Sequence, residues 1–339
     1  MKLLSIFLSL LYQSGMILRN YLYDHKLRPI YQPPLPVISV GNITFGGSEK
    51  TPLARFLLHF FYDLGFKPAL ISRGYKGRWE KKGGIVSDGQ QIFSTWEEAG
   101  DEPFMIAREF PQAGVFVGRH RLISCQRAHQ LGFNLAILDD GFQHRQLARN
   151  LDLVLHHLEP FSLQREPLSS LQRADIILMK QAFSPISSLE KKRQEIITRL
   201  RLPKQQKIFF YQLQPEGFFT LKDKISLPLE SLRSKKIIAF CGLARPQRFF
   251  NLLHQLGIQP LTTLIYPDHY PYPPRALHRI GQLWKESQAD FLCVTEKDAI
   301  KLEGREETVN WPLLYLKISL QVEEAFLEEL KKIAQNWPK

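Results

Sequence analysis

The stretch Pro36-Val37-Ile38-Ser39-Val40-Gly41-Asn42-Ile43-Thr44-Phe45-Gly46-Gly47-Ser48-Glu49-Lys50-Thr51-Pro52 decides the fold of this chain. Residues 37–40 form a β-branched run of the kind that fills a buried parallel strand. A glycine-bearing loop and Lys50-Thr51 follow, and the apolar segment 53–58 continues as a helix. In such a loop, backbone N–H groups and the helix N-terminus hold phosphate oxygens, the lysine adds a point charge and the hydroxyl reaches Mg²⁺. The stretch therefore predicts a phosphate-binding loop.

Two positions depart from the strict pattern, which has glycine where this chain has Thr44 and Glu49. Glu49 is the more serious departure, because a carboxylate beside a triphosphate repels it unless the side chain turns away or meets a cation. Arg73, Lys76 and Arg119 are the candidate cations, since they are expected at the same edge of the sheet. An ordinary glycine turn between a strand and a helix is the alternative interpretation.

The composition allows several classes of protein. With 339 residues, 44% of them hydrophobic, the chain can form one large or two ordinary domains. Its formal net charge of +12 suits an anionic partner, which would be nucleic acid, a phosphorylated substrate or an acidic lipid surface. The three cysteines are scattered and lack metal-binding spacing, so we expect each to pack as a small apolar residue.

The N-terminal segment 3–18 is almost free of charge and lies between Lys2 and Arg19. It is shorter than the roughly 20 apolar residues that a spanning helix needs, and no clear signal-peptidase site follows it. A wide apolar face, a thin polar stripe and the basic residues that follow favour a helix lying in the membrane interface. A terminal helix packed on the core, a signal peptide and a spanning segment are the alternatives.

A second strong signal is Leu135-Ala136-Ile137-Leu138-Asp139-Asp140-Gly141-Phe142-Gln143-His144, an apolar strand that ends in two carboxylates. Nucleotide-binding folds place such an acid beside the Mg²⁺ that the phosphate-loop hydroxyl also reaches. Adjacent acids followed by glycine are hard to explain as a turn alone. The segment therefore predicts that Asp139 or Asp140 lies next to Thr51.

Two further acidic or basic positions have ordinary explanations as well as functional ones. Asp101-Glu102-Pro103 begins a helix, where acidic residues are common caps. His269 follows Asp268 in a proline-rich loop and is either a surface histidine or an oriented acid–base group. The strand 68–72 runs into the basic loop of Arg73 and Lys76, which either meets phosphate or is a solvated turn.

Strands that alternate with helices along most of the chain predict an α/β fold with a doubly wound parallel sheet, of the P-loop NTPase kind. We expect a membrane-associated helix over 1–26 and a phosphate-loop kinase core over 27–206. Two strands, 208–211 and 217–221, are expected to flank a turn and form a hinge over 207–222. A smaller α/β domain would occupy 223–339, ending in an amphipathic helix over 323–333.

Together these motifs resemble the tetraacyldisaccharide 4'-kinases, the lipid A 4'-kinases of Gram-negative bacteria. The string Asp139–His144 is highly specific to that family, and the resemblance covers nearly the whole chain. The other motifs that carry it are Gly41-Asn42 with Gly46-Gly47 and Lys50-Thr51-Pro52, Ser72-Arg73-Gly74-Tyr75, Gly100-Asp101-Glu102-Pro103, Arg165-Glu166-Pro167-Leu168, Pro267-Asp268-His269 and Thr295-Glu296-Lys297-Asp298.

The resemblance implies phosphorylation of the 4'-hydroxyl of a tetraacylated, lipid-linked glucosamine disaccharide 1-phosphate. It further implies ATP and Mg²⁺ as cofactors and a peripheral position at the cytoplasmic face of the inner membrane. A β ribbon is expected to join the core to a smaller α/β domain. No nucleic-acid partner and no obligate protein partner are implied.

The resemblance also implies roles for particular residues. The catalytic group comprises Asp101, His269, Asp139 and Asp140, the first two as a dyad on the acceptor hydroxyl. Nucleotide contacts fall on Thr44, Phe45, Gly46, Gly47, Ser48, Glu49, Lys50 and Thr51. The magnesium ligands are expected among Thr51, Glu102, Asp139 and Gln143. Substrate contacts are expected from Arg73, Tyr75, Arg119 and His144.

Rival interpretations belong to other classes. A GTPase or metallochaperone would need a guanine-binding motif, and Thr295-Glu296-Lys297-Asp298 has the wrong spacing. A membrane-attached nucleotide-binding protein without kinase turnover is the stronger rival, because Glu49 could weaken the loop. A nucleic-acid binder rests on net charge alone.

Overall fold

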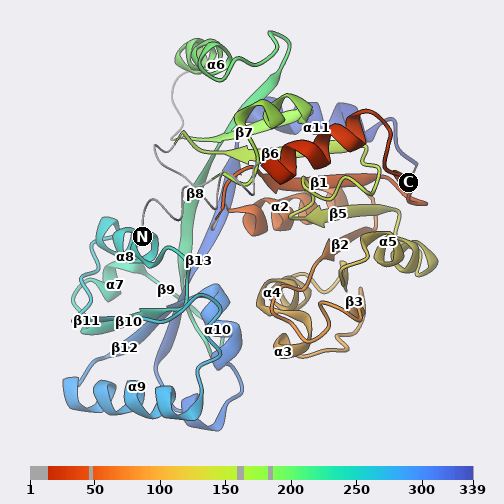
Figure 1. Cartoon of the computed structure of the whole chain (residues 1–339). Helices are drawn as coiled ribbons and strands as arrows, with labels where there is room; N and C mark the ends of the chain where they lie inside the picture. Colours follow the sequence, from red (N-terminus) through yellow and green to blue (C-terminus); the bar gives the residue numbers. More distant parts are fainter. Residues whose placement is uncertain (1–13, 46–48, 159–163, 182–185, 339) are drawn as a thin grey trace.

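The computed structural model describes residues 14–45, 49–158, 164–181 and 186–338, without the side chains of 186–188. A single mixed sheet of mostly parallel strands runs through two units (Figure 1). The strands of the first unit are β1 (Val37–Asn42), β2 (Pro68–Ser72), β3 (Gly84–Asp88), β4 (Gly114–Val117), β5 (Leu135–Asp139), β6 (Leu151–His156) and β7 (Ile176–Lys180). Its helices are α2 (Lys50–Asp63), α3 (Trp96–Ala99), α4 (Asp101–Glu109), α5 (Arg121–Gln130), the 3₁₀ helix η1 (Leu168–Arg173) and α6 (Ile186–Leu200).

The second unit continues the same sheet. Its strands are β9 (Ser226–Leu227), β10 (Ile237–Cys241), β11 (Thr262–Ile265) and β12 (Phe291–Thr295), linked to the first unit by β8 (Lys207–Thr220) and β13 (Leu313–Val322). The helices are α7 (Leu229–Leu232), α8 (Pro246–Gln255), α9 (Pro274–Ser287), α10 (Glu296–Leu302), the 3₁₀ helix η2 (Glu306–Thr308) and α11 (Glu324–Ala334). The strand order is β11-β10-β12-β13-β8-β7-β6-β1-β5-β2-β4-β3, and β9 pairs with β8.

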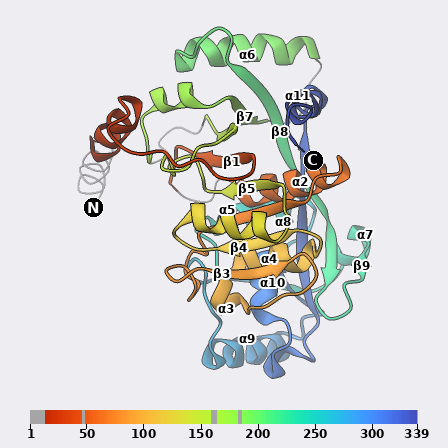
Figure 2. The same ribbon diagram turned by 90° about the vertical axis from the view of Figure 1, so that its right-hand side faces the viewer.

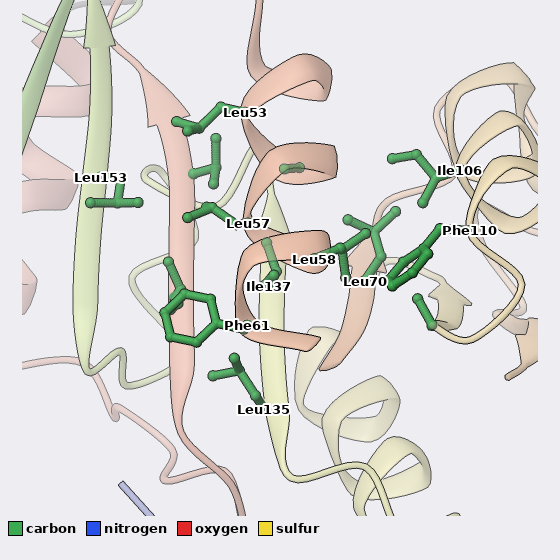
Figure 3. Close-up of a cluster of buried hydrophobic side chains, with 14 of the residues drawn as sticks. Leu53, Leu57, Leu58, Phe61, Leu70, Ile106, Phe110, Leu135, Ile137 and Leu153 are labelled. Carbon is green, nitrogen blue, oxygen red and sulfur yellow. The ribbon is translucent and has the colours of Figure 1, made fainter. Parts of the chain in front are cut away.

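Both faces of the first unit's sheet are buried, as the sequence analysis expected of a doubly wound fold. Alternate side chains of β1 serve different cores: Ile38 and Val40 pack with α2, whereas Val37 packs with α5. Figure 3 shows the leucines and Phe61 of α2 pointing between this helix and the strands. Fully burying each such side chain stabilises the fold by about 1.5–3 kcal/mol. This packing fixes the N-terminal end of α2, where the phosphate loop ends.

The hinge ribbon differs from the expectation in its second strand. Segments 208–211 and 217–221 do not flank a turn, because β8 runs unbroken from 207 to 220. Its antiparallel partner is β13, about a hundred residues further along the chain. Pro215 and Glu216, which lie between the two expected strands, fall at the register shift opposite Lys317 and Ile318 and are accommodated as a β-bulge.

The C-terminal helix also lies elsewhere than the sequence suggested. The boundary 223–339 assigned it to the second domain, but Phe326 and Leu330 of α11 are buried in the core of the first unit. Phe61 of α2 stacks on Trp337 at a centroid distance of 5.9 Å. The long β13 carries the chain back across the ribbon, so its last helix packs on the first unit (Figure 2).

The N-terminal segment enters the described part of the chain as a helix over 14–24. Its inward side chains, Met16, Asn20 and Tyr23, are buried against the first unit, while Ile17 and Leu18 are exposed. Residues 1–13 of the expected membrane helix lie outside the described residues. Among the residues that the structure describes, no helix has the length and apolar character needed to cross a membrane.

Candidate active site

A cleft of about 1550 Å³ lies between the two units and contains most of the residues that the sequence analysis singled out. Lys50, Thr51 and Asp139 line it from the first unit, and Arg248 and His269 line it from the second. In an open parallel sheet, ligands bind outside the carboxyl ends of the strands. The cleft lies at that edge, since β1 and β5 are parallel neighbours with Val40 opposite Asp139.

The lysine at the start of α2 contacts the second of the paired acids. The Lys50 ammonium lies 2.7 Å from Oδ1 of Asp140 and 3.3 Å from Oδ1 of Asn42. Arg165 lies on the same carboxylate, with Nη1 2.9 Å from Oδ2 of Asp140. Burial alone would raise the pKa of Asp140, but these two cations outweigh it and hold the pKa well below its usual value. Asp140 is therefore a permanently charged partner for the loop lysine.

Asp139 lies in the opposite electrostatic setting. Burial and the neighbouring charge of Glu102 raise its pKa to about 6. Its Oδ1 atom is buried without a hydrogen-bond partner, and Ser72 reaches Oδ2 only at 3.4 Å. Thr51 donates from Oγ1 to Oε2 of Glu102 at 2.7 Å, so the hydroxyl and both carboxylates gather in one place. Among the described residues, no group of three or more His, Cys, Asp or Glu side chains is arranged to hold a metal ion.

Gln143, the fourth expected metal ligand, lines the same cleft with its amide nitrogen already engaged. Nε2 donates to the backbone oxygen of Asn42 at 2.8 Å and to Oε1 of Glu166 at 2.9 Å. Its Oε1 atom is buried without a hydrogen-bond partner. Glu166 is itself fully buried and also accepts from Asn20 at 2.7 Å, which ties the N-terminal helix to this side of the cleft.

Asp101 and His269 come together across the cleft. Nδ1 of His269 lies 2.9 and 2.8 Å from the two carboxylate oxygens of Asp101. Asp101 occupies the first turn of α4, directly after Gly100, whose φ of 90° lets the chain turn from α3 into α4. Burial would raise the pKa of Asp101, but the hydrogen bond and charge of His269 lower it to about 2. Burial lowers the pKa of His269, and Asp101 more than compensates, so the net direction is upward.

The first turn of α10, directly after β12, supports this pair, a role that the sequence analysis did not foresee. Asp298 is fully buried and accepts from the Gly242 amide at 3.1 Å, Tyr272 at 3.0 Å and Lys301 at 3.1 Å. Gly242 in turn accepts from the amide of His269 at 3.1 Å. The sequence analysis used Thr295-Glu296-Lys297-Asp298 as one of the motifs of the family resemblance and rejected it as a guanine-binding motif, but it assigned these residues no role. The basic residues of this segment were the signal that the sequence offered, because they neutralise buried acids. Lys297 pairs with Glu102.

The four expected substrate contacts line the same cleft: Arg73, Tyr75, Arg119 and His144. The Tyr75 ring meets His269 edge-on at 5.5 Å. Burial and the charges of Arg121 and Arg19 lower the pKa of His144 to about 4, so its ring is neutral at pH 7. Arg19 and Met16 extend the lining onto the N-terminal helix. The cleft therefore has a basic rim on the side where that helix lies.

The expected nucleotide contacts are only partly described. Phe45 lines the cleft under the Arg165 guanidinium, 5.5 Å from the ring centroid, and Thr44 accepts from the Asn42 amide at 3.0 Å. Gly46, Gly47 and Ser48 lie outside the described residues. Glu49 does contact cations, but the prediction that these are Arg73, Lys76 or Arg119 is wrong. Its partners are three other side chains, namely Lys180, Arg248 and Tyr211.

The partners of Glu49 differ from the expected ones because of the strand order in the sheet, which the sequence does not reveal. Arg73 instead pairs with Glu80 at 2.7 Å, and Lys76 donates to the backbone oxygen of Asp268 at 2.8 Å. Lys180 and Tyr211 face each other in the parallel pair β7–β8, on the other side of β1.

A lysine- and threonine-bearing loop after β1, charged acids after β5 and a carboxylate–histidine pair facing them define a P-loop phosphotransferase site. The model of the LpxK family, described as tetraacyldisaccharide-1-P 4'-kinase, matches residues 1–335. The tetraacyldisaccharide 4'-kinase of Syntrophus aciditrophicus is 37% identical over 334 residues, which cover 94% of this chain and 89% of that protein. The one from Desulfatibacillum aliphaticivorans is 36% identical over 335 residues, 94% and 88% of the two chains.

A solved structure agrees with these sequence comparisons. The crystal structure of LpxK from Aquifex aeolicus in complex with ATP is 30% identical to this chain, with a TM-score of 0.74. The match covers 97% of this chain and 98% of that one. The chain belongs to the tetraacyldisaccharide 4'-kinase family and is a kinase of lipid A biosynthesis.

Proposed function

We propose that this chain transfers the γ-phosphate of ATP to the 4'-hydroxyl of a tetraacylated glucosamine disaccharide 1-phosphate. The observation that carries the proposal is the face-to-face arrangement of the cleft. Lys50 and Thr51 lie on one wall, and His269, held by Asp101 at 2.8 Å, lies on the other. Phosphoryl transfer needs charge neutralisation and positioning more than covalent chemistry, and this arrangement supplies both.

The Asp101–His269 pair would act on the acceptor hydroxyl, which is a poor nucleophile while protonated. Because Nδ1 of His269 is engaged by Asp101, Nε2 is the ring nitrogen left to meet the hydroxyl. Neutral His269 would accept the hydroxyl proton at Nε2 as the oxygen attacks the γ-phosphorus. The charge of Asp101 would then stabilise the imidazolium that forms.

Oxygen atoms around Asp139 support the proposal that a magnesium ion binds there. Asp139 has an orphaned buried oxygen and a pKa of about 6, which reflects the unfavourable burial of charge next to Glu102. Carboxylate, hydroxyl and amide oxygens are the ligands that Mg²⁺ prefers. We infer that Asp139, Thr51, Glu102 and the Oε1 atom of Gln143 would hold the ion directly or through water. When bound, Mg²⁺ supplies charge neutralisation for the phosphate oxygens.

We also propose a peripheral position at the cytoplasmic face of the inner membrane. Ile17, Leu18 and Tyr21 are exposed on the helix over 14–24, while Arg19 of the same helix lines the cleft. Exposed apolar side chains next to basic ones favour an interfacial position, and the net charge of +12 favours an anionic lipid surface. A lipid acceptor could then enter the cleft from the surface that the helix contacts.

A two-domain enzyme that closes on its substrates is the proposed organisation. The core over 27–206 and the second unit from 223 are joined by the β8–β13 ribbon, with α11 returned to the core. Closure of one unit on the other would exclude water from the transferring phosphate.

A kinase assay with labelled ATP and the lipid disaccharide 1-phosphate tests the function. Wild-type protein should form labelled lipid 4'-phosphate. The substitution Lys50→Ala should lower kcat by at least about 100-fold, the scale of losing one transition-state electrostatic group. Lys204→Ala, at an exposed lysine away from the cleft, is the matched control. ATP binding without phosphate transfer by the wild type would instead support the membrane-attached nucleotide-binding protein.

A further inference from the structure

Four side chains from four separate segments meet at the mouth of the phosphate loop, and we call them the Glu49 cluster: Glu49, Lys180, Tyr211 and Arg248. Lys180 pairs with Oε1 of Glu49, and Nη1 of Arg248 lies 3.3 Å from the same oxygen. The Tyr211 hydroxyl donates to Oε2 at 3.0 Å. Glu49 and Lys180 belong to the first unit, Tyr211 to strand β8 of the linking ribbon, and Arg248 to α8 of the second unit. The cluster is therefore a direct contact between the two units beside Lys50.

Tertiary contacts hold Glu49 in an unfavourable backbone conformation. Its φ of 62° and ψ of 23° lie in the left-handed region, and its side chain makes no cap hydrogen bond to α2. The Cβ atom of a non-glycine residue makes this conformation unfavourable, a cost that glycine avoids. The side chain of Glu49 is only 10% exposed, so its charge depends on the cluster for compensation. Because glutamate occupies this position despite the unfavourable backbone conformation, we expect its carboxylate to have a function.

The orientation of the Glu49 carboxylate explains how this residue avoids repelling a bound triphosphate, the difficulty that the sequence analysis identified. Lys180 and Tyr211 stand opposite each other on β7 and β8 and engage the Glu49 carboxylate from that side. They can keep Glu49 neutralised whether or not Arg248 remains. Arg248 is thus the partner whose departure would leave the carboxylate paired.

Arg248 is placed to exchange one anion for another. It lies on the face of α8 that lines the cleft, together with Leu252 and Gln255, and its guanidinium contacts the residue next to Lys50. Guanidinium groups match phosphate oxygens with two parallel hydrogen bonds, and a triphosphate carries more charge than one carboxylate. Phosphates bound by the loop lysine would therefore compete with Glu49 for this arginine.

We propose that Arg248 is a nucleotide-binding residue supplied by the second unit, and that Glu49 holds it in place until the triphosphate arrives. On binding, the guanidinium moves from the Glu49 carboxylate to the phosphate oxygens, and Lys180 and Tyr211 keep the carboxylate turned away. The second unit thereby becomes coupled to the nucleotide through one side chain. This inference rests on ATP being the phosphate donor, as proposed above.

Calorimetric titration of MgATP into the full-length protein tests the role of Arg248. A hydrogen-bonded charge pair is worth about 1.5–3 kcal/mol, so Arg248→Met should weaken ATP binding by about 10-fold or more. Arg275→Met, at an exposed arginine of the same unit on α9, is the control and should stay within about twofold of wild type. Unchanged affinity of a folded Arg248→Met protein would overturn the inference, with folding checked by thermal denaturation.

A double-mutant cycle that combines Glu49→Gln with Arg248→Met separates two explanations. Either Arg248 moves from Glu49 to the phosphates, or the Glu49 carboxylate only repels ATP. Removing the carboxylate charge should raise ATP affinity about 3- to 10-fold in the wild-type background, since Arg248 is released. In the Arg248→Met background the gain should fall to about twofold or less. Equal gains in both backgrounds would show that Glu49 merely repels the triphosphate, which overturns the exchange. If the wild-type protein does not bind ATP, the proposed kinase function is wrong. If the wild type binds ATP but the cycle shows equal gains, only the role of Arg248 is wrong.

Discussion

Removing the charge of Asp101 is the most direct test of how the two units share the chemistry. Asp101→Asn keeps the size of the side chain and an oxygen that can accept from Nδ1 of His269, so the contact at 2.8 Å need not be lost. What disappears is the negative charge that raises the pKa of His269. We expect the substituted protein to fold and to bind ATP, but to transfer phosphate poorly.

The magnitude follows from the geometry and burial of the pair. The drop in the pKa of Asp101 from 3.8 to about 2 corresponds to about 2 kcal/mol in favour of the charged form. That preference comes from His269 together with Lys297 and Lys301, and the part due to His269 grows when the ring becomes an imidazolium in the transition state. General-base groups contribute about 10²–10⁴-fold, so kcat should fall by about 10²-fold or more.

The assay compares kcat for Asp101→Asn, His269→Asn and the double substitution with that of wild type. Residues that act as a unit give losses that do not multiply, so the double variant should be little worse than the worse single one. Asp268→Asn is a matched control, because this exposed carboxylate lies 3.7 Å from the other ring nitrogen of His269. An exposed charge pair is worth at most about 1 kcal/mol, so its effect should stay below about fivefold. Strictly multiplicative losses, or a tenfold loss from Asp268→Asn alone, would refute the reasoning.

Two further predictions concern the metal site and the N-terminal helix. The pKa of Asp139 is raised to about 6 from 3.8, so without metal its ionisation destabilises the fold increasingly as pH rises from about 4 through 6. Asp139→Asn should therefore raise the Tm of the metal-free protein at pH 7.5. It should also abolish the Tm increase that Mg²⁺ gives the wild type. Equal Mg²⁺ effects on the Tm of both proteins in scanning calorimetry would contradict this. Deleting 1–13 should release the protein from anionic vesicles in a flotation assay with Tm unchanged, whereas deleting 1–24 should also lower Tm, because Asn20 and Tyr23 are buried and Asn20 donates to Glu166. Equal Tm values for the two truncations would show that the described helix adds nothing to the fold.

The predictions that held rest on short stretches of sequence. Strand, loop and helix follow one another within residues 37–63, so the position of Lys50 is set by neighbours along the chain. The same is true of Asp139 at the end of β5 and of Asp101 on the first turn of α4. Such features depend on hydrophobic periodicity and on helix-terminus chemistry, both of which are local.

The predictions that failed required knowledge of which strands are neighbours. The partner of β8 is β13 and not an adjacent segment, and the cations on Glu49 come from β7 and α8 rather than from the loop after β2. Partner choice depends on the strand order, because residues a hundred positions apart in the chain can be cross-strand neighbours, with Cβ atoms about 4.5–5.5 Å apart. No periodicity in a single sequence encodes that order.

The sequence by itself therefore determined the phosphate loop, the paired acids and the kinase family, since each is carried by residues adjacent in the chain. Only the tertiary structure decided that Nδ1 of His269 meets Asp101 at 2.8 Å, that Lys301 lies 3.7 Å from Asp101, and that Glu49 contacts Arg248. The physical reason is that each of these contacts joins two separately folded segments. Its distance is set by how β8 and β13 place the second unit over the first.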